Sequence, residues 1–152
     1  MVNWLEKNAL AKIFSIIFLY LIVSCTPFNS QHINTQTQLQ LGLAYIQLNQ
    51  YDLAEKQLQQ AVLSKKNYFD GLQALTYLYQ LMGKPEKARP LYHKMLQKYP
   101  TSFKAYNNYG IFLCQQKEYP KAILAFNIAL KYDPENKEIH KNLQLCKNIK
   151  EF

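Results

Sequence analysis

The stretch that decides the fold is GKPEKARPLYHKMLQKYP, Gly83–Pro100, because its pattern returns further along the chain as KEYPKAILAFNIALKYDP, residues 117–134. In both, an alanine is followed four residues later by an aromatic residue, and proline ends the stretch. A fixed period of this length predicts repeated supersecondary units. The columns that keep the interval of 34 are Ala54, Ala88 and Ala122; Leu58, Tyr92 and Phe126; Ala61, Met95 and Ala129; Tyr45, Tyr79 and Leu113; and Leu41, Leu75 and Tyr109.

The small residues and prolines of the repeat indicate helix pairs. Gly42 and Gly110 share a column in which two helices are expected to cross closely, and the second unit has Thr76 there. Pro85 and Pro120 suit the first turn of a helix. Helix–turn–helix repeats with this period and signature resemble the tetratricopeptide repeat. The resemblance implies an all-α superhelix of three helix–turn–helix repeats and a C-terminal capping helix.

The repeat boundaries divide the chain. We expect a signal peptide at 1–24, a lipidated tether at 25–34, repeats at 35–68, 69–102 and 103–136, and the capping helix at 137–152. Pro90 predicts a bend in its helix, or a late start of the regular part. The last helix has one apolar stripe and a lysine-rich opposite face, as a cap requires. The helices are expected near 35–48, 51–64, 69–82, 85–98, 103–116, 119–132 and 137–150.

The N-terminal segment predicts the compartment. Lys7 and Lys12 precede an uncharged run of 12 residues, Ile13 to Ser24, which is shorter than the roughly 20 residues of a membrane-spanning helix. Such a segment is typical of a secretory signal. The junction LIVSC resembles the bacterial lipobox, which implies attachment of diacylglycerol to Cys25, cleavage before it, and acylation of its amino group. The alternative is a plain signal peptide or an uncleaved anchor with an incidental cysteine.

The residue after the lipobox cysteine points to one membrane. Thr26 stands where aspartate would, which in lipoproteins of this kind resembles the default route to the outer membrane. We therefore expect the chain to be held by its lipid at the inner leaflet of the outer membrane, facing the periplasm. The net charge of +8 fits a solvated lysine face as well as an anionic partner.

Motifs for bond chemistry are missing from the sequence. It contains no glycine-rich phosphate loop, nucleophile elbow, CxxC motif or HExxH motif. The histidines are scattered at His32, His93 and His140. Many of the aromatic residues occupy repeat columns, which leaves few to stack on nucleic-acid bases. We expect no catalytic residue, no metal site, no small-molecule substrate, no nucleic acid and no cofactor beyond the covalent lipid on Cys25.

The resemblance to tetratricopeptide repeats also implies where a protein partner binds. Such arrays usually take peptides or helices in the concave groove lined by the first helix of each repeat. Asn107 and Asn108 are candidate clamps for a partner's backbone, because buried carboxamides need hydrogen-bond partners. The alternative is that Asn108 is solvated or caps a neighbouring loop. The implied groove residues are Leu39, Leu43, Ile46, Gln73, Tyr77, Gln80, Lys104, Asn107, Asn108, Ile111, Lys141 and Asn142.

A narrower resemblance lies in NNYGIFLCQQKEYPKAILAFNIAL, residues 107–130. With the lipobox and the repeats, this run is similar to the type IV pilus biogenesis and stability lipoproteins of the PilF/PilW family. That resemblance implies a pilotin-like adaptor, which performs no catalysis, binds the secretin subunit and promotes its outer-membrane localisation and multimerisation. Gln144 stands where the family has a glycine. The alternative is a repeat lipoprotein that scaffolds peptidoglycan enzymes or outer-membrane assembly factors.

Two further cysteines fall late in helices of the same type. Neighbouring helices of that type pack side by side, so Cys114 and Cys146 are candidates for a disulfide, which the periplasm permits. The bridge would close a loop of about 30 residues and add on the order of 3 kcal/mol. The alternative is two free thiols packed as small apolar residues.

Overall fold

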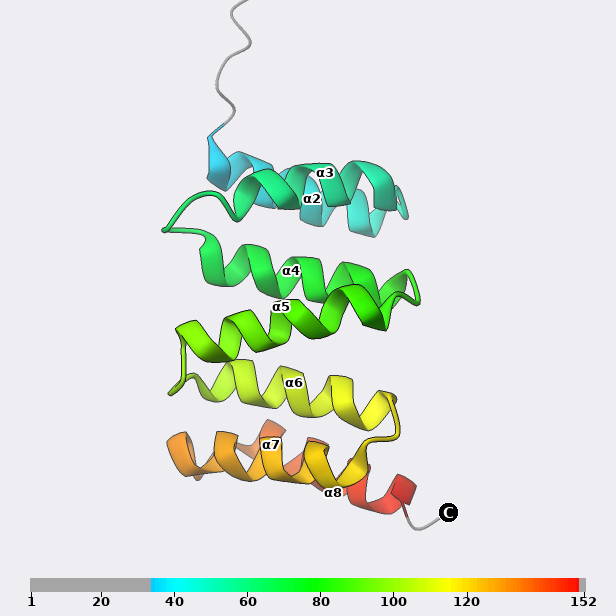
Figure 1. Ribbon diagram of the computed structural model, residues 1–152, viewed down its shortest axis with the longest axis vertical. Helices are drawn as coiled ribbons and strands as arrows, with labels where there is room; N and C mark the ends of the chain where they lie inside the picture. Colours follow the sequence, from blue (N-terminus) through cyan, green and yellow to red (C-terminus); the bar gives the residue numbers. More distant parts are fainter. Residues whose placement is uncertain (1–33, 151–152) are drawn as a thin grey trace, which may run out of the picture. The chain divides into compact units, whose positions relative to one another are not determined.

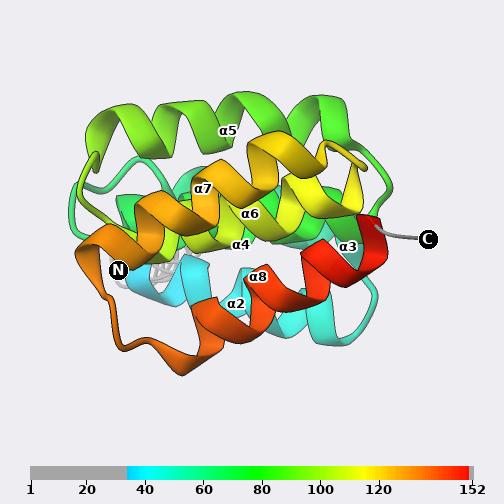
Figure 2. The ribbon, with the colours of Figure 1, turned by 90° about the horizontal axis from the view of Figure 1, so that it is seen from below.

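The computed structural model describes residues 34–150, and within them the regular elements are seven helices and no strands. Consecutive helices run in alternate directions, and the chain passes from α2 and α3, which overlap at the top of the view, through α4, α5 and α6 to α7 and α8, which overlap at the bottom (Figure 1). Seen from below, α5 lies along one side, and α2 and α8 along the opposite side (Figure 2). The all-α array of helix pairs expected from the sequence is confirmed. The helices are α2 (Thr35–Gln47), α3 (Tyr51–Ala61), α4 (Tyr68–Leu81), α5 (Pro85–Lys98), α6 (Phe103–Gln115), α7 (Tyr119–Tyr132) and α8 (Lys137–Lys150).

Side-chain caps and prolines fix where several helices begin. The side chain of Asn34 accepts a hydrogen bond from the amide of Gln36 at 3.1 Å, and that of Ser102 accepts one from the amide of Ala105 at 3.2 Å. These bonds satisfy amides that have no partner inside the helix. A proline lies in the first turn of α5 and of α7, where its missing amide hydrogen costs nothing.

The turn between the two helices of each pair has the same backbone conformation in every repeat. Asn49, Gly83 and Lys117 occupy the same position in successive repeats and have φ values of 56°, 65° and 63°. Glycine adopts this left-handed conformation without steric cost, and asparagine more readily than other residues. The turn geometry is therefore set by the repeat rather than by the residue type at the turn.

One helix boundary differs from the sequence prediction by more than one residue. Helix α3 ends at Ala61, three residues early, where the chain turns at Val62. A Cβ atom at Gly71 would lie 2.7 Å from Val62 Cγ1, so α4 approaches this turn too closely for α3 to continue. Helix α5 spans Pro85–Lys98, as predicted, and continues through Pro90, so of the two effects predicted for Pro90 the late start was wrong.

The core lies between the paired helices, and glycine sets their distance in the first and third pairs. A Cβ atom at Gly42 would lie 2.5 Å from the Leu58 side chain, and one at Gly110 would lie 2.8 Å from the Phe126 ring. Both large side chains are fully buried. The glycine column therefore marks a close crossing, as the sequence indicated.

Candidate protein-binding groove

The second helix pair differs from the other two at this position, and a pocket lies beside it. Thr76, which is buried, takes the place of the glycine, and Tyr92 of α5 is the large residue in the column of Leu58 and Phe126. The Tyr92 ring also packs against α6, with centroids 5.4 Å from Tyr109 and 5.1 Å from Phe112. Helix α2 packs on α4, and α6 on α8, but no comparable contact joins α4 to α6.

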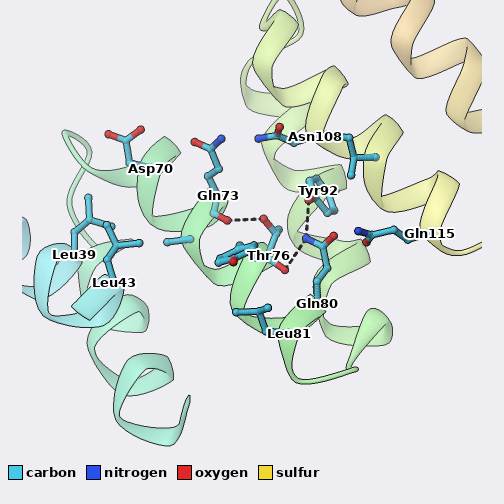
Figure 3. A pocket seen from close by; sticks show the side chains of 13 residues that line it. Leu39, Leu43, Asp70, Gln73, Thr76, Gln80, Leu81, Tyr92, Asn108 and Gln115 are labelled. Atoms are coloured by element: carbon cyan, nitrogen blue, oxygen red, sulfur yellow. Dashed lines mark hydrogen bonds between the residues drawn. The ribbon is translucent and has the colours of Figure 1, made fainter. Parts of the chain in front are cut away.

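The pocket occupies the seam between α4 and α6 and reaches α2. Its volume is about 870 Å³, and Figure 3 shows α4 running through its middle. The residues that α4 contributes recur every three or four positions, which places them on one face of the helix. The pocket is lined by Leu39, Leu43, Asp70, Gln73, Ala74, Thr76, Tyr77, Gln80, Leu81, Tyr92, Asn108, Ile111 and Gln115.

Apolar side chains are exposed in this pocket. Leu43 and Leu81 are each 42% exposed and Tyr77 is 52% exposed, although all three lie on helices whose other large apolar residues are mostly buried. Ile111 adds a half-buried apolar wall from α6. A concentration of exposed apolar surface in a concave site is typical of a binding site.

Carboxamides from both sides give the pocket its polarity. Gln80 is fixed, because its Nε2 donates to the Thr76 carbonyl and to the Tyr92 hydroxyl, each at 3.0 Å. The side chains of Gln73 and Gln115 make no hydrogen bond to another described residue, and that of Asn108 has only a long bond of 3.4 Å from Asn107. The pocket therefore offers donors and acceptors on opposite walls.

The pocket carries little charge. Asp70 is the one charged residue among those that line it within the described range, and it is exposed. Burial raises the pKa of the Tyr92 hydroxyl despite its hydrogen bonds with Thr76 and Gln80, so this group is neutral at physiological pH. Nothing in such a lining favours an acidic ligand.

Part of the groove expected from the sequence lies in this pocket. The structure brings seven of the expected residues together there, and adds six that sequence reasoning did not select. For Thr76 and Tyr92 the sequence did offer a signal. Threonine stands in the glycine column of the second repeat, so the packing of Tyr92 could be expected to differ there. The seven are Leu39, Leu43, Gln73, Tyr77, Gln80, Asn108 and Ile111; the six are Asp70, Ala74, Thr76, Leu81, Tyr92 and Gln115.

The other expected groove residues lie outside this pocket. Ile46 is 7% exposed and belongs to the core. Asn107 is 6% exposed, and its Oδ1 accepts a hydrogen bond of 3.1 Å from Nδ2 of Asn142 on α8, so both amides serve the contact between α6 and α8. Lys104 and Lys141 are exposed but lie outside the pocket lining.

A disulfide reinforces the same helix contact. Cys114 of α6 and Cys146 of α8 are bonded, with Cα atoms 5.9 Å apart. The bond and the pair of asparagines hold α8 against α6, and α6 provides one wall of the pocket. The lipidation site expected at Cys25 lies outside the residues that the structure describes.

Two other kinds of site are absent from the described residues. None of the helices between 34 and 150 combines the length and the apolar character that crossing a membrane needs. Over the same residues, no group of three or more His, Cys, Asp or Glu side chains gathers in a way that would hold a metal ion.

The comparisons with known proteins agree on the fold. Two models described as tetratricopeptide repeat match the chain, one at residues 35–68 and the other at residues 80–145. The tetratricopeptide-repeat domain of Sgt2 from Aspergillus fumigatus superposes with a TM-score of 0.68 at 18% identity, over 77% of this chain and 79% of that one. At that identity the likeness concerns the fold alone.

Two bacterial relatives are more similar in sequence. An uncharacterized protein of Haemophilus influenzae is 30% identical over 128 residues, 82% of this chain and 72% of the relative. The type IV pilus assembly protein PilF of Pseudomonas aeruginosa is 32% identical over 110 residues, which are 70% of this chain and 43% of PilF. A solved PilF structure superposes with a TM-score of 0.66 at 29% identity, over 76% of this chain and 54% of that one. This chain therefore spans only about half of PilF.

Proposed function

Because this chain belongs to the tetratricopeptide-repeat family, whose members are typically non-catalytic scaffolds for protein interactions, we propose that it is a pilotin-like adaptor that captures a segment of the type IV pilus secretin. In this proposal it performs no bond chemistry. It binds the secretin subunit and promotes its arrival and multimerisation in the outer membrane.

The observation that carries the proposal is the pocket between α4 and α6, considered with the similarity to PilF. Asn108 and Ile111 of the run NNYGIFLC line the pocket, while Gly110 and Leu113 of the same run are buried. The stretch that carries the narrower resemblance therefore supplies a wall of the pocket as well as part of the core. This supports a role for the run in binding as well as in folding.

The proposal includes an anchor at the membrane. A lipid on Cys25 would lie nine residue positions before Asn34, where the described domain begins. A chain of that length spans at most about 30 Å. The pocket would then stay close to the outer membrane, where a secretin subunit must insert.

The binding step is tested in the native bacterium by deleting the gene and restoring it in three forms. The forms are the unchanged protein, a pocket variant with Leu43→Ala and Tyr77→Ala, and a surface control with Leu53→Ala and Tyr132→Ala. The control residues are of the same types and are 44% and 41% exposed, but lie outside the pocket. Heat-resistant secretin multimers are then measured by blotting.

We expect multimers to fall in the deletion strain and with the pocket variant, and to be normal with the control. Normal multimers at normal outer-membrane levels in the deletion strain would refute the pilotin role, and would favour a scaffold for other envelope proteins. Cys25→Ala tests the anchor separately. We expect this variant to leave the membrane fraction, and unchanged fractionation would exclude the lipid anchor.

A further inference from the structure

We propose that the pocket between α4 and α6 selects an extended peptide segment with one bulky apolar side chain and, three residues away, one lysine or arginine. This inference rests on the proposed function, in that the pocket is taken as the protein-binding site. It adds which side chains the bound segment must carry, whichever protein that segment belongs to.

The apolar side chain is required by the middle of the pocket. Tyr77 lies on the central helix with half of its surface exposed, and Leu43 of α2 and Ile111 of α6 line the same pocket. A phenylalanine or leucine of the partner would cover these side chains and remove their apolar surface from water. The volume of about 870 Å³ is ample for one such side chain with the backbone on either side of it.

The free carboxamides indicate an extended rather than a helical segment. Gln73 on α4 and Asn108 on α6 are drawn at the same rim of the pocket in Figure 3, and Gln115 lies further along α6. Each carboxamide offers both a donor and an acceptor. A helix already uses its amides and carbonyls internally, whereas an extended segment presents them to both walls.

The charge of the pocket indicates the second feature of the segment. Asp70 is the only charged residue among the described lining residues, and its carboxylate lies at the rim beside Gln73 (Figure 3). A lysine or arginine of the partner would pair with it in partly solvated surroundings. Since no lysine or arginine lines the pocket within the described range, an acidic partner side chain would meet only repulsion from Asp70.

The positions of the two features fix their spacing. Asp70 and Tyr77 both belong to α4 and lie seven residues apart, which is about 10 Å along a helix axis. An extended chain covers that distance in about three residues. The segment therefore carries its cationic residue about three positions from its apolar one, in either chain direction.

The test uses the full chain purified in detergent micelles and four capped, fluorescein-labelled peptides. The first two are Ser-Phe-Ser-Ser-Lys-Ser and its reverse sequence. The other two peptides are variants of whichever of the first two binds more tightly. In the third peptide glutamate replaces the lysine, and in the fourth peptide serine replaces the phenylalanine. Fluorescence anisotropy gives the dissociation constants.

We expect loss of the phenylalanine to weaken binding at least tenfold. Exchange of lysine for glutamate should weaken it about two- to fivefold, as for an exposed ion pair. Asp70→Asn should abolish the difference between the lysine and glutamate peptides. Leu43→Ala and Tyr77→Ala should each weaken binding, whereas the matched controls Leu53→Ala and Tyr132→Ala should not. Circular dichroism checks that each variant is folded.

The proposal is overturned if the glutamate peptide binds as tightly as the lysine peptide, if the serine peptide binds as tightly as the phenylalanine peptide, or if none of the four binds. It is also overturned if the controls weaken binding as much as the pocket variants. Peptide selectivity without any effect of gene deletion on secretin multimers would leave this inference intact and refute the pilotin role. Loss of secretin multimers on gene deletion, without any peptide selectivity, would refute only this inference.

Discussion

The Nε2 atom of Gln80 on α4 donates a 3.0 Å hydrogen bond to the hydroxyl of Tyr92 on α5. The same nitrogen also donates to the Thr76 carbonyl, so one carboxamide joins the two helices at the base of the pocket. The Tyr92 ring packs against α6. This pair of residues therefore connects the three helices whose arrangement defines the pocket.

Removal of this hydroxyl should weaken the domain modestly. Tyr92→Phe deletes the acceptor but keeps the ring, so we expect the free energy of unfolding to fall by about 0.5–1.5 kcal/mol. Urea denaturation followed by circular dichroism measures the change. Tyr109→Phe is a comparison at a half-buried tyrosine of α6, whose hydroxyl lies 3.1 Å from Nε2 of His93 in an exposed hydrogen bond. A larger loss there than at Tyr92 would contradict this account.

A methyl group at Gly110 should be poorly tolerated. Its Cβ atom would lie 2.8 Å from the Phe126 ring, so Gly110→Ala should lower the free energy of unfolding by about 1–3 kcal/mol through overpacking. Phe126→Leu creates space at the same contact. The two changes together should therefore cost less than the sum of the single changes, and strict additivity in a double-mutant cycle would argue against a direct clash.

Glycine at residue 117 should stabilise the protein. Lys117 has a φ of 63°, which costs a non-glycine residue roughly 1–2 kcal/mol, while glycine loses about 0.5–1 kcal/mol more entropy on folding. Lys117→Gly should therefore raise the free energy of unfolding by roughly 0.5–1 kcal/mol in urea denaturation. Gly83→Ala, at the equivalent turn, should have the opposite sign. A stabilising effect of this second variant would contradict the strain argument.

Reduction of the disulfide should destabilise the cap and the third repeat. The bond joins residues 32 apart in sequence, and loop entropy gives about 3–4 kcal/mol for a loop of that size. Dithiothreitol should lower the urea midpoint of the unchanged protein. It should not affect a variant with both Cys114→Ala and Cys146→Ala, which reports any effect of the reductant that is unrelated to this bond.

Glu55 should make stability depend on acid pH. Burial raises the pKa of this carboxyl, but hydrogen bonds from Tyr79 and Lys87 and the nearby lysine charges outweigh it, so the pKa lies below its ordinary value. A lowered folded-state pKa contributes stability that is present above about pH 4.5 and is lost as the pH falls through the folded value. Glu55→Gln should flatten the pH dependence of the unfolding free energy below pH 4.5. An unchanged slope would show that Glu55 is not the group responsible.

The fold was predictable from the sequence, because one fixed interval recurs in so many columns. Glycine, proline and aromatic residues act over short distances, so Gly42, Gly110, Pro85 and Pro120 indicated local geometry without knowledge of the rest of the chain. The end of α3 was not predictable in the same way. It depends on how closely Gly71 of the next helix approaches Val62.

The candidate site was predictable only in part, as two pairs of residues illustrate. Leu43 is exposed in the pocket, whereas Ile46, less than one turn further along α2, is buried. Asn108 lines the pocket, whereas Asn107 bonds to Asn142. Adjacent positions on a helix point about 100° apart, so the angle at which the next helix packs decides which of them faces the groove.

The sequence by itself therefore determined the helices, their pairing and their turns, since these follow from local propensity and a fixed period. Only the tertiary structure decided that α4 and α6 separate and that Tyr92 stands between them. The exchange of glycine for Thr76 is visible in the sequence. Its consequence is not, because the width of the seam depends on where α4, α5 and α6 settle around the buried Tyr92.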